Sequence, residues 1–242
     1  MRPGLLSAPR GGEEFCLPLF AALEGDALGW QERIDLYARR TGFPRSLFLS
    51  ADGRVVGTWI MGNDYRVKSG YYGGYPAGYL RRIAALFPDK RRVLHLFAGR
   101  VDLSALPGDT VDINAALSPT YVDDAQSLKN VPLPDYDLVL ADPPYSVEDA
   151  ERYQTTMVKR NRVMRALSRL PAGAHVVWLD QVLPMYRKDL FDIEAVIGMV
   201  KSTNHRFRVI TVFRRRGPDA PQAAASSTTR RRRGAPASGS AA

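Results

Sequence analysis

The sequence has little of what disulfide-rich, metal-binding and membrane proteins need. One of its 242 residues is cysteine, Cys16, which excludes an internal disulfide framework and a cysteine-rich zinc site and favours a reducing, cytoplasmic setting. Only three residues are histidine, and no His, Cys and carboxylate cluster has metal-site spacing. No apolar run is long enough to cross a bilayer, and no apolar signal core precedes Gly11. We therefore expect neither a metal centre nor a membrane partner.

Positive charge, by contrast, is abundant. The chain has 34 Lys and Arg residues against 25 Asp and Glu residues, a formal net charge of +9. The arginine run 230–233 accounts for part of this excess, but most of it lies outside the last 26 residues. Such a balance suits a polyanionic partner, so we expect nucleic acid; a gain in solubility is the alternative explanation.

Composition divides the chain into four parts. Residues 1–12 are rich in Pro, Gly and Arg, and residues 217–242 are of low complexity, so both are expected to be disordered. Residues 13–91 form a predicted N-terminal α+β extension. Its elements are a helix within 13–40, a hairpin over 46–61, a Gly- and Tyr-rich loop, and a short helix over 79–87.

Residues 92–216 show strand-like apolar runs that alternate with loops and helices. A helix is predicted over 148–170, where Pro171 ends it. This alternation predicts an α/β fold with a Rossmann-like, doubly wound mixed sheet of about seven strands. The last two strands are expected to form an antiparallel pair at the edge of the sheet. The predicted strands are 93–97, 110–113, 120–122, 136–141, 175–179, 191–196 and 208–213.

An Asp-Pro-Pro-Tyr sequence follows the fourth predicted strand. In open α/β sheets, ligands bind at the carboxyl ends of the strands. Pro143 and Pro144 fix the local backbone and remove two donors, which leaves carbonyl groups to face a ligand. Asp142 can accept hydrogen bonds from an amino group, and Tyr145 can stack on a flat ring. These groups are suited to holding a nucleobase by its exocyclic nitrogen.

Three other strand ends carry candidate ligand-binding residues. Phe97-Ala98-Gly99 ends the first predicted strand, where a glycine lets the backbone turn beneath a ligand. Asp112 ends the second and can accept from both hydroxyls of a ribose, although an ordinary turn aspartate would look the same. Asp124 follows the third and can accept from an amino group, with a helix N-cap as its alternative role.

Two further segments offer aromatic or basic contacts. Tyr71, Tyr72 and Tyr75 lie in the Gly- and Tyr-rich loop and could present flat faces to a ligand, or could simply pack in a long connection. His205 lies between the last two strands and could contact a substrate, or be a turn histidine.

Between residues 93 and 213 the chain resembles class I S-adenosylmethionine-dependent methyltransferases of the amino-methyltransferase branch. The Asp142–Tyr145 sequence resembles the catalytic motif of DNA adenine methyltransferases. The resemblance implies that Phe97, Ala98 and Gly99 begin a cofactor loop. It also implies that Asp112 binds the cofactor ribose, and that Asp124 and Ala125 lie at its adenine.

The implied activity is methyl transfer from S-adenosylmethionine to the N6 amino group of adenine in DNA. Asp142 and the Pro143 carbonyl would accept the two amino hydrogens, and Tyr145 would stack on the base after it is flipped out. The chain departs from the family where the cofactor loop continues with Arg100 in place of further glycines, and where the following helix is cut down to about 103–107. An amino-methyltransferase of RNA or protein, and a catalytically silent nucleic-acid-binding module, are the alternatives.

Overall fold

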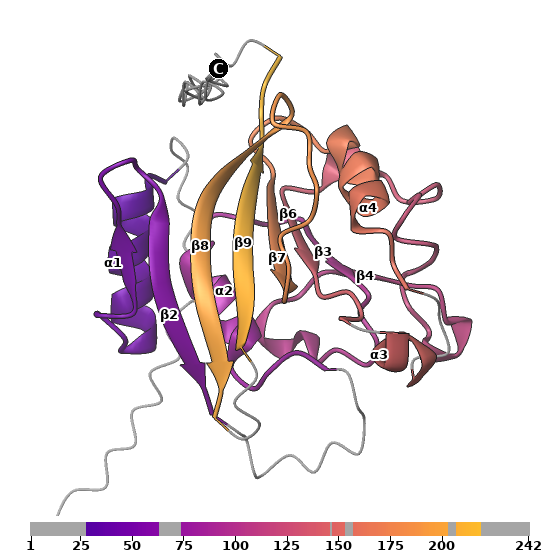
Figure 1. The fold of residues 1–242 in the computed structure, drawn as a ribbon, viewed down its shortest axis with the longest axis horizontal. Helices are drawn as coiled ribbons and strands as arrows, with labels where there is room; N and C mark the ends of the chain where they lie inside the picture. The colour runs from indigo at the N-terminus through magenta and orange to yellow at the C-terminus, as the bar shows by residue number, and fades with distance from the viewer. Residues whose placement is uncertain (1–27, 63–73, 146, 153–156, 203–206, 219–242) are drawn as a thin grey trace, which may run out of the picture.

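Nine strands of the described chain form one mixed sheet (Figure 1). The computed structural model describes residues 28–62, 74–145, 147–152, 157–202 and 207–218. The strands are β1 (Leu47–Leu49), β2 (Val55–Met61), β3 (Val93–Leu96), β4 (Asp109–Asp112), β5 (Tyr121–Val122), β6 (Leu138–Ala141), β7 (His175–Asp180), β8 (Phe191–Lys201) and β9 (Phe207–Arg215). Their order across the sheet is β1-β2-β8-β9-β7-β6-β3-β4-β5.

The order and direction of the strands confirm the predicted Rossmann-like fold. Strands β5, β4, β3, β6 and β7 pair in parallel, and β9 runs antiparallel between β7 and β8. The last two strands form the predicted antiparallel pair, but the prediction that this pair lies at the edge of the sheet is wrong. The hairpin β1-β2 extends the sheet beyond them, because β2 pairs with β8 in parallel. The residues of the predicted extension and those of the predicted methyltransferase domain therefore share one sheet.

The helices cover the two faces of the sheet. They are α1 (Trp30–Thr41), α2 (Tyr79–Leu86), α3 (Val147–Arg152) and α4 (Arg160–Ala166), with four short 3-10 helices, η1 (Leu103–Ala105), η2 (Ala115–Leu117), η3 (Leu133–Asp135) and η4 (Leu167–Arg169). The expected continuous helix over 148–170 is instead divided. Lys159 is extended (φ −79°, ψ 93°) and its N–H donates to the Gln126 side chain at 3.0 Å, so α4 begins at the next residue.

Alternate residues of the strands pack into two cores. In β6, Leu138 and Leu140 face the core shared with α1 and α2, whereas Val139 and Ala141 face the core shared with α4. This alternation on both faces is typical of a strand buried between two helical layers. It produces a rigid central sheet whose strand ends are held in fixed positions.

Buried polar contacts fix the direction of α1. The Trp30 indole donates to Glu194 at 3.1 Å, and its ring lies 6.1 Å from His175, the first residue of β7. The Arg33 guanidinium is 2% exposed and pairs with Asp89 after α2. The helix therefore begins at the amino end of β7, and its last turn lies toward the carboxyl ends of the parallel strands (Figure 1).

Candidate functional site

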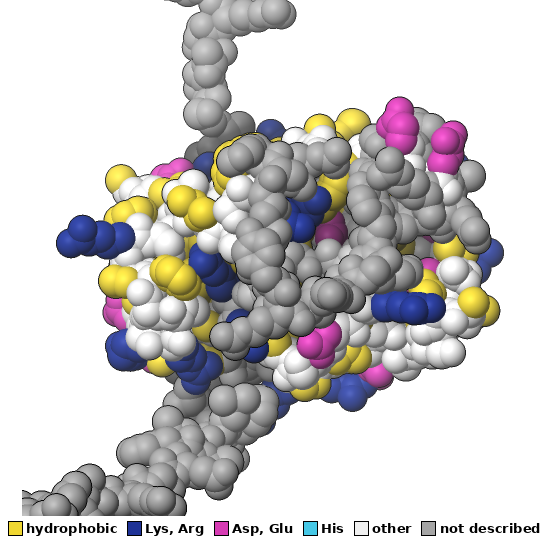
Figure 2. All heavy atoms as spheres, turned by 90° about the horizontal axis from the view of Figure 1, so that it is seen from below, with side chains coloured by type: hydrophobic (Ala, Val, Ile, Leu, Met, Phe, Trp, Pro, Cys, Tyr) yellow, Lys and Arg dark blue, Asp and Glu magenta, His cyan; other side chains and the backbone are white. Residues whose placement is uncertain are grey.

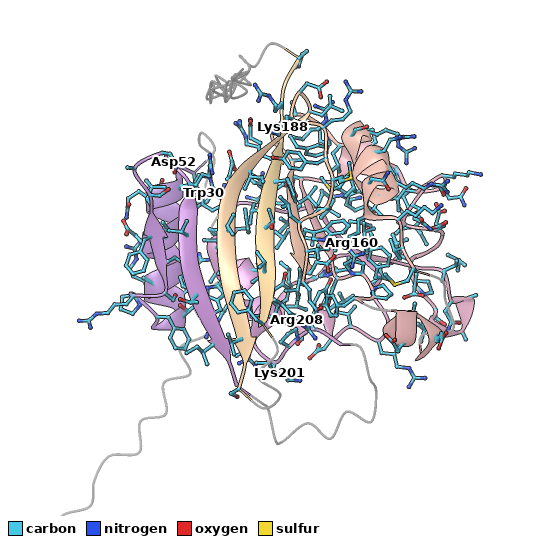
Figure 3. All side chains as sticks on the ribbon, in the orientation of Figure 1. Trp30, Asp52, Arg160, Lys188, Lys201 and Arg208 are labelled. Atoms are coloured by element: carbon cyan, nitrogen blue, oxygen red, sulfur yellow. The ribbon has the colours of Figure 1, made fainter. Side chains whose placement is uncertain are left out.

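The carboxyl ends of β3, β4 and β6 meet at one edge of the sheet. Because these strands are parallel neighbours, the residues that follow them lie close together. Three predicted groups come together in this way: Phe97–Gly99 after β3, Asp112 at the end of β4, and Asp142–Tyr145 after β6. Since β9 is antiparallel, it begins at the same edge, which brings Arg208 to the site (Figure 3).

The loop after β3 turns sharply. Phe97 has φ 57° and Gly99 has φ 56°, both in the left-handed region, and Phe97 lacks the freedom of glycine there. The Ala98 N–H donates to the Val111 carbonyl at 3.2 Å, which ties the loop to β4. Backbone conformations of this kind are commonly found at ligand sites.

Asp112 joins this loop to the next one. Its carboxylate accepts from the Gly99 N–H and from the Asn114 N–H, each at 2.9 Å. The side chain is partly exposed, and each carboxylate oxygen has a second lone pair that can accept a hydrogen bond from a ligand hydroxyl. Asp112 thus both shapes the loop and presents acceptors at the strand ends.

Asp124 and Ala125 lie after β5, on the far side of β4. The Asp124 carboxylate accepts from the backbone N–H of Gln126 at 2.9 Å and from its side-chain amide at 3.3 Å, so it caps a turn. Ala125 is 5% exposed and packs in the core. The helix N-cap expected as the alternative role of Asp124 is not formed, because the residues that follow make a turn and no helix.

The Asp-Pro-Pro-Tyr segment is partly buried, with both prolines inside and the side chains of Asp142 and Tyr145 half-buried. The Tyr145 hydroxyl donates to the Asp142 carboxylate. Burial, and then the charge of Asp142, raise the pKa of Tyr145 well above its ordinary value. The phenol therefore stays protonated and remains a hydrogen-bond donor.

Two more tyrosines adjoin this carboxylate. The rings of Tyr75 and Tyr79 stack with centroids 5.2 Å apart, and both hydroxyls are buried without a hydrogen-bond partner among the described residues. Burial is the first cause of a pKa well above the ordinary value in both, and the charge of Asp142 adds to it. Buried unpartnered donors cost stability and point to a missing partner, such as a ligand or a water.

His95 contributes an acceptor next to these donors. Its Nε2 lies 3.1 Å from the Leu106 carbonyl, which fixes the proton on Nε2 and leaves a lone pair on Nδ1. That Nδ1 atom is buried and has no partner among the described residues, and the His95 ring centroid is 6.1 Å from that of Tyr75. Burial lowers the pKa of His95 to about 4, so the ring is neutral at pH 7.

Arg208 is a site residue that the sequence did not identify. Its guanidinium lies 4.4 Å from the centroid of the Tyr145 ring, a cation–π contact. Tyr79 ends the Tyr-rich segment 71–79, which the family resemblance associates with cofactor contact, but the sequence did not single it out, because it also begins an amphipathic helix. Among the other predicted residues, Tyr71, Tyr72 and His205 lie outside the described residues.

A buried ion pair stabilises the chain beyond the motif. Asp180 ends β7, is 1% exposed, and accepts from the Arg160 guanidinium at 2.6 and 3.1 Å. The same carboxylate accepts from the Trp178 indole at 3.1 Å and the Gln181 N–H at 2.7 Å. Arg160 opens α4, so this contact anchors that helix beside the site and engages an arginine that could otherwise have met phosphate.

The described residues hold neither a candidate membrane span nor a candidate metal centre. None of the helices in these ranges has the length and apolar character that a bilayer crossing requires. Within the same ranges, no group of three or more His, Cys, Asp or Glu side chains could hold a metal ion.

Among known proteins, similarity is found to solved structures. No protein-family model matches the sequence, and no curated protein does. The structure is similar to the crystal structure of the N-methyltransferase NodS from Bradyrhizobium japonicum WM9, at a TM-score of 0.38 and 11% identity over 57% of this chain and 93% of that one.

Proposed function

We propose that the chain is an S-adenosylmethionine-dependent methyltransferase that acts on the N6 amino group of adenine in DNA. The observation that carries the proposal is the Asp142 carboxylate, which stands at the carboxyl end of β6 in contact with the Tyr145 hydroxyl. Near it are the Tyr75 and Tyr79 hydroxyls and the Nδ1 atom of the neutral His95, which have no partner among the described residues. The Asp-Pro-Pro-Tyr motif and the Rossmann-like strand order support the same activity.

The residues at the strand ends fit S-adenosylmethionine. Asp112 offers carboxylate lone pairs for ribose hydroxyls at the end of β4, and the tight turn at Phe97–Gly99 brings backbone close to that position. The unpartnered hydroxyls of Tyr75 and Tyr79 are polar atoms that a bound ligand would satisfy. The bound cofactor would supply an electrophilic methyl group.

Asp142 and the Pro143 carbonyl would accept the two hydrogens of the target amino group. These contacts favour a tetrahedral nitrogen, whose lone pair is no longer delocalised into the ring and could attack the methyl group in line. The nitrogen would thereby displace a neutral thioether from the sulfonium, and the methylated nitrogen would lose a proton to Asp142, which passes it to water. Positioning and preorganised acceptors therefore do the catalytic work, without a strong base. The Tyr145 hydroxyl donates to one oxygen of Asp142 in this structure, so it competes with the amino group for that oxygen.

A catalytically silent nucleic-acid-binding module is the second candidate. It is favoured by the internal pairing of Asp112, whose two oxygens already accept backbone N–H groups. Calorimetry with S-adenosylmethionine distinguishes the two, because a silent module would release no heat of binding.

The decisive test uses S-adenosylmethionine with a labelled methyl group and separate pools of DNA, RNA and protein. We expect label in the DNA pool, on adenine N6, and its loss in Asp142→Asn. Asp135→Asn, which removes an exposed carboxylate before the amino end of β6, is the matched control and should retain full activity. Label in the RNA or the protein pool alone would show that RNA or protein, and not DNA, is the substrate. Absence of label from every pool, together with absence of cofactor binding, would refute the proposal that the chain is a methyltransferase.

A further inference from the structure

The last turn of α1 and the loop after it form an unusually basic surface. Between Asp35 and Asp52 the sequence has no acidic residue, but it has three arginines, Arg39, Arg40 and Arg45. All three side chains are exposed and form no ion pair with another described residue. Seven other arginines of the described chain pair with acids: Arg33, Arg54, Arg92, Arg160, Arg187, Arg214 and Arg216. Arg162 and Arg165 on α4 are also exposed and have no ion pair among the described residues.

An exposed aromatic ring lies among these arginines. Phe43 is 48% exposed, and the Arg82 guanidinium lies 4.3 Å from its ring centroid. Arg82 in turn donates to the Ile60 carbonyl at 3.2 Å, which fixes the guanidinium beside β2. We name Arg39, Arg40, Phe43 and Arg45 the arginine surface.

The arginine surface lies on the same edge of the sheet as Asp142. The last turn of α1 lies toward this edge, and so does the carboxyl end of β2, which is parallel to β8. Figure 3 shows Lys201 and Arg208 at this edge, with Trp30 and Asp52 at the other end. Five strand spacings separate β6 from β1, which is about 24 Å measured across the sheet.

Two exposed apolar side chains lie near the carboxyl ends of the parallel strands, on the sheet face opposite to the one that α1 covers. Ile60 at the end of β2 is 70% exposed, and Phe207 at the start of β9 is 57% exposed, on the same row of the sheet; the neighbours of Ile60 along β2, Trp59 and Met61, pack in the core shared with α1. Lys201 ends β8 between them, and Arg208 follows at Tyr145. Figure 2, which looks onto this edge, shows Lys and Arg side chains among hydrophobic ones on the side of α1 and β2.

We propose that the arginine surface binds the phosphate backbone of duplex DNA whose target base lies at Asp142. Uncompensated arginines bind phosphates, and an exposed ring such as Phe43 can pack against a sugar or base. Arg39 and Arg40 also suit the negative end of the α1 dipole, but that role does not extend to Arg45 in the loop. The proposal rests on the proposed function, because the target position at Asp142 comes from it.

The separation between the two sites predicts the length of DNA that the protein covers. A span of about 24 Å corresponds to about seven base pairs at the rise of B-form DNA. Duplexes that extend less than this on one side of the target adenine should bind more weakly than longer ones. The triple variant Arg39→Gln, Arg40→Gln, Arg45→Gln should bind the short and the long duplexes with the same affinity.

Salt titration of binding to a fluorescein-labelled duplex tests the surface. Removing one bound phosphate should reduce the slope of log K against log salt by about 0.9, so we expect a reduction of about 2 to 3 in the triple variant. The matched control is Arg91→Gln, Arg187→Gln, Lys188→Gln, which removes equal charge near the amino ends of β3 and β8 and should change the slope by less than about 1. If the arginine triple does not fold, Arg45→Gln against Lys188→Gln makes the same comparison.

Equal effects of the two triple variants, or no effect of the arginine triple variant, would refute phosphate binding by the arginine surface. Binding to duplex RNA in place of duplex DNA would show that DNA is not the partner. Both triples should bind S-adenosylmethionine as the wild-type protein does. Failure of the wild-type protein to bind S-adenosylmethionine, with DNA binding abolished in the arginine triple alone, would refute the proposed methyl transfer while leaving the surface in place.

Discussion

The Tyr145 hydroxyl donates a hydrogen bond to the Asp142 carboxylate three residues earlier in the chain. The tyrosine of the motif thereby occupies an acceptor of its aspartate. The Arg208 guanidinium lies 4.4 Å from the centroid of the Tyr145 ring. The aromatic ring and the carboxylate are thus positioned by contacts within the site. Binding of an amino group to Asp142 exchanges one hydrogen bond for another, which lowers the cost of uncovering the carboxylate.

Tyr145→Phe should show the contribution of the Tyr145 hydroxyl separately from that of the ring. Phenylalanine keeps the flat face and the contact with Arg208 but removes the donor that competes for Asp142. We expect the KM for DNA to stay the same or fall, and kcat to stay within about tenfold, because a competing hydrogen bond of about 1 kcal/mol is removed. Steady-state methylation of a duplex substrate measures both constants.

Tyr145→Ala is the companion variant, because it removes the ring as well. Stacking on an aromatic ring is worth about 1–3 kcal/mol per base, so its KM for DNA should rise about five- to a hundredfold. The affinity for S-adenosylmethionine should not change in either variant. A phenylalanine variant as impaired as the alanine variant would show that the hydroxyl, and not the ring, is the group that acts.

Asp112→Ala should weaken the binding of S-adenosylmethionine by about ten- to a hundredfold. The change removes a charged acceptor and also frees the Gly99 and Asn114 N–H groups that shape the loop; hydrogen bonds to a charged group are worth about 1.5–3 kcal/mol. Calorimetry measures the dissociation constant. Asp109→Asn, at the amino end of the same strand, should bind normally, and an unaltered constant in Asp112→Ala would remove Asp112 from the cofactor site.

The strands were largely predictable from the sequence because buried strands leave continuous apolar runs. The runs at 93–97 and 136–141 correspond to β3 and β6, and the acids that follow strands meet at one edge because the strands are parallel. The place of the hairpin in the same sheet was not predictable, because β2 pairs with β8 across more than a hundred residues of chain. A pattern along the chain carries no information on such a distant pairing.

The missed site residues have a similar cause. Arg208 reads as one more charged residue at a strand start, and only the antiparallel insertion of β9 beside β7 brings it to Tyr145. Tyr79 fits the apolar stripe of a helix, and its unpartnered hydroxyl becomes visible only once α2 is packed on the sheet. The break in the helix over 148–170 depends on a contact with Gln126, which is distant in sequence.

The buried His95 should make stability rise with pH between about 4 and 6.5. Its pKa is lowered to about 4 by burial, so in this window the unfolded chain binds a proton that the folded chain does not. The stability from the neutral ring is complete above pH 6.5 and is lost as pH falls toward 4. Relative to His95→Gln, the wild-type protein should lose about 2 kcal/mol more in its free energy of unfolding between pH 7 and pH 5.

Urea unfolding of both proteins at the two pH values measures this difference. His175 and Glu194 also titrate with lowered pKa, but they are common to both proteins and cancel in the comparison. Equal pH dependence in the wild-type protein and the variant would show that His95 has the same pKa in the folded and the unfolded chain. Such a result would mean that burial does not hold the ring neutral between pH 4 and pH 6.5.

The Arg160–Asp180 pair should be strongly coupled. Asp180→Asn leaves the guanidinium without its buried counter-charge, and Arg160→Met leaves a buried carboxylate held only by neutral donors, so each should cost about 3 kcal/mol of unfolding free energy. The double variant should cost clearly less than the sum of the two, as urea unfolding of the four proteins would show. Arg187→Ala, which breaks the exposed pair with Asp189, should have no measurable effect, because solvent screens that contact. Additive losses for Arg160 and Asp180 would mean that the two side chains stabilise the protein independently and that their contact does not anchor α4.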